Sequence, residues 1–370
     1  MSNIVIFIPK DNVAYNFRSE LFLKLHELGH RVILVCPYGK KLEFFRERGL
    51  VVIDLPIDRR GTSVWNDAKL TREYIRIIRE TKADLVLTYT TKCSVYGGFA
   101  CEATGTPYIV NTAGIMQNGD RLSPLESFIL LLYRFALRKA SCLMYQNDHE
   151  AELLNKVMGH KVHWRRIPGS GVNLESFPFT PYPENDDPIT FNYVARIMKG
   201  KGIAEYLDCA ERIRANFPNT RFIIYGDFDD DSYRTRVESL QARGIVEYGG
   251  IQLDMKPCIA KAHAVIHPAY YEGMTNVVLE HSAMGRVCIG SDVPGVREGI
   301  EDGKTGYLFQ VRSVESLVEK VATFIRLPHE EKARMGRNAR AKMEREFSRE
   351  IVTNIYLEEI DRVLNNKKAL

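Results

Sequence analysis

The sequence predicts an α/β protein built from two successive units, each with a parallel sheet covered by helices. Short β-branched runs alternate with helix-length amphipathic segments from the first residues onward. This alternation stops at a segment rich in Pro, Gly and Asn that begins at Gly169, and it then starts again. The length of 370 residues also exceeds what one ordinary core holds, and it indicates about two to three domains.

In the first unit, short apolar runs are expected to form strands. They begin at Asn3 (NIVIFI), Arg31 (RVILVC), Val51 (VVIDL), Asp84 (DLVLTY), Tyr108 (YIVNT) and Cys142 (CLMYQ). The segments FRSELFLKLHELG and DAKLTREYIRIIRE between them carry apolar residues at three- and four-residue spacing, which favours amphipathic helices. Near-continuous apolar strands joined by helices are typical of a parallel sheet with both faces covered.

The second unit repeats this pattern. Strands are expected from Ile189 (ITFNYVAR), Arg221 (RFIIYG), Ala264 (AVIHP) and Arg286 (RVCIGSD), and the chain is expected to be helical from Ser313 to its end. Ligands of open parallel sheets bind beyond the carboxyl ends of the strands. With two such sheets, we expect the site in the cleft between them.

The composition, 45% hydrophobic and 26% charged, is that of an average globular protein and excludes a disordered chain, a coiled coil or a disulfide scaffold. No apolar run approaches the roughly 20 residues that span a bilayer. The start, MSNIVIFIPKDN, does not have the pattern of a signal peptide. We therefore expect a cytoplasmic protein, or one attached to the inner face of the membrane. The seven dispersed cysteines indicate reduced thiols.

The net charge of +4 is unevenly distributed: residues 1–180 carry 24 Lys and Arg against 18 Asp and Glu. The asymmetry arises either by chance or because two domains bind different ligands. One segment of this basic half, SPLESFILLLYRFALRKAS from Ser123, combines an apolar run with Arg134, Arg138 and Lys139. Such a helix could contact an anionic membrane, or its apolar side could simply cover the first sheet.

Two patterns resemble metal sites, and each has a simpler interpretation. HELGH at His26–His30 matches a zinc-protease helix signature, but Gly29 predicts that the helix ends before His30. The acidic run from Asp227 to Asp231 could hold Mg²⁺ or Mn²⁺ against a nucleotide diphosphate. We favour a solvated loop in which an Asp caps the next helix.

Arg196 and Lys201 form the first candidate anion-binding pair. Arg196 lies at the end of a predicted strand, and Lys201 follows five residues later, just before a predicted helix. A guanidinium and an ammonium at a strand-to-helix loop can clamp a diphosphate without a metal, and the helix N-terminus adds N–H donors. The alternative is that Lys199 and Lys201 are ordinary solvated loop charges.

The segment HPAYYEGMTNVVLEHSAMG predicts a loop followed by a buried helix, with Thr275 or Asn276 as its N-cap. Gly273 frees the backbone, so the amides at 273–276 could bind phosphate or sugar hydroxyls. Glu280 falls one turn into the helix, too far from Glu272 for double-displacement glycoside hydrolysis. The two carboxylates could instead bind different parts of one extended ligand, although Glu280 could also be only a surface charge.

These motifs resemble the retaining glycosyltransferases of family 4, which have the two-Rossmann GT-B fold. The resemblance covers nearly the whole chain. It rests on E-x7-E at Glu272–Glu280, R-x4-K at Arg196 and Lys201, and the sequences from Ala283 to Gly295 and DGKTGYLF. The N-F-R of PKDNVAYNFRSELFLKLHELGHRV is similar to the bacterial capsule, exopolysaccharide and lipid-linked-oligosaccharide branch.

The resemblance implies a domain division and an activity. It implies an acceptor-binding Rossmann-like domain over 1–170, a linker over 171–188, a nucleotide-sugar-binding domain over 189–346 and a helix over 347–370 that returns to the first domain. The activity is that of a retaining hexosyltransferase without a metal or other cofactor. It would move a sugar, expected to be UDP-linked, to a saccharide acceptor, expected to be lipid-pyrophosphate-linked. No nucleic-acid partner is implied.

The resemblance also implies roles for individual residues. Arg196 and Lys201 would hold the diphosphate and Glu280 the ribose hydroxyls. The sugar and the distal phosphate would be held by Glu272 and the amides of Gly273, Met274, Thr275 and Asn276, and the base pocket would be lined by Gly250 and Ile251.

On the acceptor side, their position and charge lead us to expect that Asn16, Arg18 and Lys92 contact an acceptor pyrophosphate. In VNTAGIMQNGD, where many members carry a histidine, this chain has Asn111, Thr112 and Gly114, which leaves the donor sugar open. Alternative functions are a GT-B epimerase of UDP-sugars, a phosphorylase, or a protein that binds sugar nucleotides without turnover.

Overall fold

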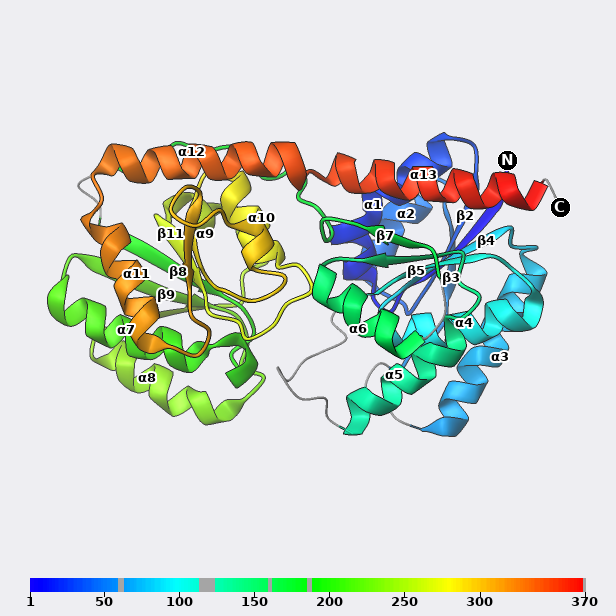
Figure 1. The fold of residues 1–370 in the computed structure, drawn as a ribbon, viewed down its shortest axis with the longest axis horizontal. Helices are drawn as coiled ribbons and strands as arrows, with labels where there is room; N and C mark the ends of the chain where they lie inside the picture. The colour runs from blue at the N-terminus through cyan, green and yellow to red at the C-terminus, as the bar shows by residue number, and fades with distance from the viewer. Residues whose placement is uncertain (59–62, 113–123, 159–161, 185–187, 369–370) are drawn as a thin grey trace. The chain divides into compact units, whose positions relative to one another are not determined.

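The computed structural model describes residues 1–58, 63–112, 124–158, 162–184 and 188–368 (Figure 1). The chain divides into two compact units, and each is built around one parallel sheet. The first unit contains the described residues of 1–170 together with 350–368, and the second contains those of 171–349. The prediction of two α/β units with parallel sheets is confirmed.

The sheet of the first unit has seven strands in the order β3-β2-β1-β4-β5-β6-β7. Every neighbouring pair is parallel, and β1 is paired with both β2 and β4. The chain order therefore reverses between β1 and β4, which is the switch point of a doubly wound fold. The strands are β1 (Asn3–Phe7), β2 (Arg31–Cys36), β3 (Val51–Asp54), β4 (Leu85–Tyr89), β5 (Tyr108–Asn111), β6 (Cys142–Tyr145) and β7 (Trp164–Arg166).

Helices cover both faces of this sheet, because its strands are apolar on both sides (Figure 1). One face packs against α1 (Asp11–Glu27), the short α2 (Glu43–Arg46) and the C-terminal α13 (Arg349–Lys368). The other face packs against α3 (Val64–Glu80), α4 (Thr91–Thr104), α5 (Pro124–Ala136) and α6 (Asp148–Met158). The side chains of Tyr356 and Ile360 in α13 are fully or almost fully buried, so this distant helix completes the core of the first unit.

The sheet of the second unit has six parallel strands in the order β10-β9-β8-β11-β12-β13. It repeats the topology of the first sheet, with its switch point between β8 and β11. The strands are β8 (Ile189–Val194), β9 (Thr220–Tyr225), β10 (Glu247–Gly250), β11 (Ala264–His267), β12 (Val287–Ser291) and β13 (Gly306–Phe309).

The helices of the second unit also lie on both faces of its sheet. Helices α7, α8 and α11 pack into one core with Phe191 and Phe222, and α10 packs on the other face against Val265 and Cys288. The bounds are α7 (Ile203–Asn216), α8 (Arg234–Ala242), α9 (Lys256–Lys261), α10 (Asn276–Ala283), α11 (Val314–Arg326) and α12 (His329–Glu346).

Candidate functional site

The two loops that leave the switch point of the second sheet are locked together by their backbones. Gly202 has φ +69°, and a Cβ atom there would lie 2.0 Å from the carbonyl oxygen of Pro268. The amide of Tyr270 donates a 3.0 Å hydrogen bond to the carbonyl of Gly200. Only glycine fits at position 202, and this close approach brings the neighbouring Lys201 to the loop that carries Glu272.

A third loop, after β12, fixes the backbone around Glu272. Gly295 has φ +82°, and a Cβ atom there would lie 2.2 Å from the carbonyl oxygen of Glu272. Its own carbonyl accepts a 3.0 Å hydrogen bond from the amide of Thr275. Thr275 occupies the N-cap position of α10 and, like Met274 beside it, is buried. These contacts fix the backbone of Gly273–Asn276 at the start of α10. Thr275 takes the N-cap position, one of the two positions that the sequence predicted.

Three charged or polar side chains converge at this switch point, and we call them the switch cluster: Lys201, His267 and Glu272. The ammonium of Lys201 lies 2.5 Å from Oε1 of Glu272, and Nε2 of His267 lies 3.1 Å from the same oxygen. Because an ionised carboxylate can only accept hydrogen bonds, Nε2 of His267 carries the hydrogen. The structure brings two predicted site residues from different motifs, Lys201 and Glu272, into direct contact.

The switch cluster keeps Glu272 ionised. Burial favours the neutral acid, but the hydrogen bond from His267 and the charge of Lys201 outweigh it and lower the pKa of Glu272 to about 2. At neutral pH this side chain is therefore a fixed acceptor with almost no tendency to take up a proton. The sequence analysis missed His267. A polar residue at the carboxyl end of the otherwise apolar strand AVIH was the available signal.

Arg196 also lies beyond the carboxyl ends of the strands, but its ion-pair partner is Asp229 instead of Glu272. Its guanidinium donates a 2.8 Å hydrogen bond to Oδ2 of Asp229, and about half of its side chain is exposed. Asp229 belongs to the acidic loop after β9, whose backbone is bonded to Ile197. A diphosphate that binds Arg196 would therefore compete with Asp229 for the guanidinium.

The acidic loop has the contacts expected of a solvated capping segment. Asp230 accepts a 3.0 Å hydrogen bond from the amide of Ser232 at the start of a short 3₁₀ helix, which confirms the predicted capping role. Asp227 accepts from the amide of Phe228, and Asp231 forms an ion pair with an arginine of α8. These carboxylates face separate partners instead of one common point.

Glu280 lies in α10, one turn after the segment that carries Glu272. Burial raises the pKa of its carboxyl to about 7, although the positive charge of Arg349 opposes this shift. Within the described part of the chain, the carboxylate of Glu280 makes no hydrogen bond. It is therefore a half-buried acid that still has its hydrogen-bonding capacity to offer.

The two residues predicted to line a base pocket lie at the carboxyl end of the edge strand β10. Gly250 has φ +66°, and its carbonyl accepts a 3.0 Å hydrogen bond from the amide of Gly226 after β9. Ile251 follows with 64% of its surface exposed. An exposed apolar side chain at a strand end offers a surface for a flat apolar or aromatic group.

In the first unit, three of the predicted acceptor residues lie inside the fold. The guanidinium of Arg18 lies 5.3 Å from the ring centre of Tyr89 and 5.6 Å from that of Tyr356. The amide of Asn111 donates a 2.7 Å hydrogen bond to the hydroxyl of Tyr356. Thr112 is fully buried, and its hydroxyl donates to a backbone carbonyl. Arg18 and Asn111 thus meet at Tyr356 of α13, whereas Gly114 lies outside the described residues.

Lys92 lines a cavity of about 690 Å³ in the first unit. Its ammonium lies 2.8 Å from Oδ1 of Asp67, whose Oδ2 accepts a 2.6 Å hydrogen bond from the hydroxyl of Tyr96. The side chains of Lys92 and Asp67 are only 13% and 12% exposed. We call this space the Lys92 cavity. Its wall combines this ion pair with apolar and polar side chains, among them Pro37, Leu55, Ile57, Asn66, Lys69, Leu70 and Glu73.

Asn16 lies apart from these three buried residues, since its side chain is exposed on α1. The structure therefore separates the acceptor-side candidates into a buried group around Tyr356, the cavity residue Lys92, and an exposed residue on α1.

Residues 178–342 match the family Glycosyl transferases group 1, and residues 17–169 match the Glycosyl transferase 4-like domain. These two matches follow the two α/β units and together account for most of the chain. The chain belongs to the GT-B glycosyltransferases. The resemblance stated from the sequence motifs is confirmed.

Similar proteins include bacterial glycosyltransferases. This glycosyltransferase is 21% identical over 302 residues (77% of each chain) to the UDP-Gal:alpha-D-GlcNAc-diphosphoundecaprenol alpha-1,3-galactosyltransferase of Escherichia coli. It is 22% identical over 341 residues (87% of each chain) to the capsular polysaccharide biosynthesis glycosyltransferase CapM of Staphylococcus aureus.

Solved structures share the complete fold. A glycosyltransferase from Rickettsia africae superimposes with a TM-score of 0.80 at 17% identity, over 99% of both chains. The Anabaena protein Alr3699/HepE, in complex with UDP and glucose, gives a TM-score of 0.78 at 16% identity, over 98% of this chain and all of the other.

The zinc-protease pattern of this glycosyltransferase is broken by the end of a helix. Helix α1 ends at Glu27, and Gly29 follows with φ +82°, so His30 lies outside the helix. As predicted, the helix ends before His30, so the two histidines do not lie on one helix face.

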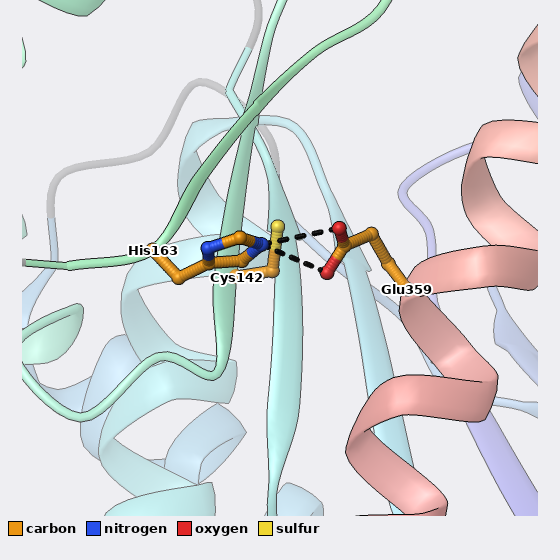
Figure 2. A group of neighbouring side chains, drawn as sticks. All are labelled: Cys142, His163 and Glu359. Atoms are coloured by element: carbon orange, nitrogen blue, oxygen red, sulfur yellow. Dashed lines mark hydrogen bonds and ion pairs between the residues drawn. The ribbon is translucent and has the colours of Figure 1, made fainter.

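Among the described residues, one group of potential metal ligands remains: Cys142, His163 and Glu359, whose ligand atoms lie within 4.8 Å of one another (Figure 2). Both oxygens of Glu359 lie 3.1 Å from Nε2 of His163, and one accepts a 2.7 Å hydrogen bond from Arg362. Burial raises the pKa of the Cys142 thiol to about 12. The carboxylate of Glu359 is already bonded to Arg362 and His163, and these contacts attach α13 to the first sheet.

Among the described helices of this glycosyltransferase, none is both long and apolar enough to cross a membrane.

Proposed function

We propose that the protein is a retaining hexosyltransferase that moves a sugar from a UDP-sugar to a lipid-pyrophosphate-linked saccharide in bacterial surface polysaccharide assembly. The observation that carries the proposal is the switch cluster, which holds one cation and one ionised carboxylate at the strand ends where this fold binds ligands. The names of the Escherichia coli relative and of the Anabaena complex support a UDP-sugar donor. The reaction would take place at the cytoplasmic face of the membrane.

The second unit is proposed to bind the donor through its diphosphate. Lys201 and Arg196 would contact the phosphates, and Arg196 would exchange Asp229 for a phosphate oxygen. The amides of Gly273, Met274 and Asn276 would add donors at the start of α10, whereas the amide of Thr275 is already bonded to the carbonyl of Gly295. Fixed cations at this point stabilise the negative charge that develops on the leaving UDP, so the chemistry needs neither a metal nor another cofactor.

Two carboxylates are proposed to bind opposite ends of the donor. Glu272, ionised and held by Lys201, would accept hydrogen bonds from sugar hydroxyls. Glu280, whose carboxylate has no hydrogen bond among the described residues, would bind the ribose hydroxyls. Gly250 and Ile251 would line the base pocket, because they place an exposed apolar surface at the end of β10.

The low pKa of Glu272 bears on how configuration would be retained. A carboxyl with a pKa of about 2 cannot hold the proton of the acceptor hydroxyl at neutral pH. The leaving diphosphate is a stronger base, so we propose that one of its oxygens takes this proton. The acceptor then attacks from the face that UDP leaves, and the anomeric configuration is kept.

The first unit is proposed to bind the acceptor, with its saccharide in the Lys92 cavity. The wall of this cavity offers apolar side chains for the C–H faces of a sugar and carboxylates for its hydroxyls. The charge of Lys92 is already balanced by Asp67, so it would contact the acceptor as a hydrogen-bond donor. Asn16 would contact the acceptor from the exposed side of α1. Arg18, Asn111, Thr112 and Gly114 stay acceptor-side candidates, the first two acting through Tyr356.

The decisive experiment measures UDP release from a panel of UDP-sugars with and without an undecaprenyl-diphosphate-linked saccharide, in buffer containing EDTA. We expect release that depends on the acceptor, persists in EDTA and yields a product with the donor's anomeric configuration by NMR. Epimerised UDP-sugar without an acceptor would identify an epimerase. UDP binding without any turnover would identify a binding protein. Loss of activity in EDTA that Mn²⁺ restores would overturn the metal-free mechanism.

A further inference from the structure

Helix α5 of the first unit carries apolar side chains on two faces, and only one of these faces packs into the core. Its buried face, which includes Leu130 and Tyr133, packs into the core beneath it. On the other side, the side chains of Phe128, Leu131 and Phe135 are 56%, 48% and 51% exposed. At about 100° per residue, these three positions fall within an arc of about 60° on the helix surface. They therefore form a continuous exposed apolar stripe.

Basic side chains lie beside this stripe and at the end of the helix. At the same angular spacing, Arg134 lies on one side of the stripe, and Arg138 and Lys139 are exposed in the turn that follows the helix. The one acidic residue of α5, Glu126, is buried on the inner face. Arg138 is paired with Glu102, whereas Arg134 and Lys139 form no ion pair among the described residues. Phe128, Leu131, Phe135, Arg134 and Lys139 together are called the α5 surface below.

A second exposed apolar group lies at one end of the same helical layer. Val64 and Trp65, the first residues of α3, are 79% and 86% exposed. In a parallel sheet each helix returns from the carboxyl end of one strand to the amino end of the next. Helices α3 and α5 therefore both begin at the carboxyl edge of the first sheet. The residues that follow Trp65 line the Lys92 cavity.

We propose that the α5 surface binds the headgroup region of an anionic lipid bilayer. An apolar stripe bordered by cations is the pattern of helices that lie in a membrane interface, where the rings enter the acyl boundary and the cations contact anionic headgroups. Aromatic residues such as Trp65 are favoured at the same depth. A protein partner of this surface would have to supply acidic side chains for its cations, because the one acidic residue of α5, Glu126, is buried on the inner face.

The proposed binding does not depend on the transfer reaction. Its use does rest on the proposed function, since a bilayer at the carboxyl edge of the first sheet would present a lipid-linked acceptor beside the Lys92 cavity.

The test is flotation of the full-length protein with vesicles of phosphatidylcholine alone or with about one third phosphatidylglycerol, at low and high salt. We expect binding to the anionic vesicles that is at least about tenfold stronger than to neutral ones and that weakens at high salt. The variant Phe128→Gln/Leu131→Gln/Phe135→Gln should lose at least about tenfold in vesicle affinity. The matched control Leu28→Gln/Leu253→Gln changes two exposed leucines elsewhere, 54% and 104% exposed, and should bind as the unchanged protein does.

Two further measurements separate this inference from the proposed function. UDP affinity and the melting temperature of the triple variant should equal those of the unchanged protein, because no changed side chain contacts the core or the donor site. Vesicle binding that survives the triple substitution would overturn the proposal. It would equally be overturned if light scattering showed a dimer that the substitutions dissolve, since the surface would then join two copies of the chain.

Discussion

The two switch points have the same topology but carry different chemistry. In the second unit, charged groups converge where the strand order reverses: Lys201 and His267 share one oxygen of Glu272. In the first unit, the strand ends border a cavity whose wall mixes apolar and polar side chains and includes the ion pair of Lys92 with Asp67. A diphosphate carries a constant charge that fixed cations can match, whereas a saccharide needs shape and hydrogen bonds. The difference supports the proposal that the second unit binds the diphosphate of the donor and the first unit the saccharide of the acceptor.

The strongest test of this comparison is Lys201→Met. It removes the cation proposed for the diphosphate and keeps the hydrogen bond between His267 and Glu272, so kcat/KM for the donor should fall about 10³-fold, a loss typical of a group that stabilises developing charge. Steady-state kinetics with a circular-dichroism check of folding measures this effect. Lys199→Met, at an exposed lysine of the same loop, should stay within about twofold. Equal losses in both variants would mean that only the total loop charge matters.

Arg196 and its partner should respond in opposite directions. Arg196→Ala should lower kcat/KM about 10²-fold, because one phosphate contact is lost. Asp229→Asn removes the carboxylate that competes for Arg196 and should tighten UDP binding about threefold by calorimetry. If Asp229→Asn instead weakened UDP binding as Arg196→Ala does, the ion pair would serve to position the guanidinium.

Lys92→Met should affect only the acceptor side. Loss of the Lys92 donor and of its pairing with Asp67 should raise the KM for the acceptor about tenfold, while the KM for the donor stays the same. Arg72→Met removes the same charge from an exposed position of α3 and serves as the control. A change in donor KM with Lys92→Met would contradict the proposed division of labour between the two units.

The smallest expected effect is the pH dependence of folding stability that Glu280 causes. Burial raises the pKa of Glu280 from 4.5 to about 7, so between these values the folded chain keeps a proton that the unfolded chain releases. Stability should therefore fall as the pH rises through this window and stay lower above it.

Glu280→Gln removes this titration. Its melting temperature should exceed that of the unchanged protein by about 2–4 °C at pH 8 and by much less near pH 5. A gain of the same size at both pH values would show that Glu280 titrates equally in both states.

The strands that sequence patterning missed all lie at sheet edges, whereas of the identified strands only β3 does. Every strand expected from an apolar run is present, whereas β7 (WRR), β10 (EYGG) and β13 (GYLF) were not predicted. All three lie at a sheet edge, where pairing with one neighbour suffices and a short polar or glycine-containing segment can form a strand. Local hydrophobicity does not detect such strands, because tertiary pairing creates them.

The candidate site divides in the same way. Arg196, Lys201, Glu272 and Glu280 could be proposed from motif spacing, because the first three lie in predictable loops after strands and Glu280 lies one turn into a predictable helix. The burial of Arg18 and Asn111 could not, since Tyr356, which contacts both, is 245 residues from Asn111 in the chain. No local pattern reveals that a C-terminal helix covers them.

The sequence alone determined two α/β units, the R-x4-K and E-x7-E motifs and the resemblance to GT-B glycosyltransferases, because periodicity and spacing are properties of neighbouring residues. Only the tertiary structure decided that His267 joins Lys201 at Glu272, that Arg196 is paired with Asp229, and that Glu280 keeps a raised pKa. These properties depend on the distances between separate loops and on the burial of side chains. Both are determined by the path of the backbone in the folded sheets.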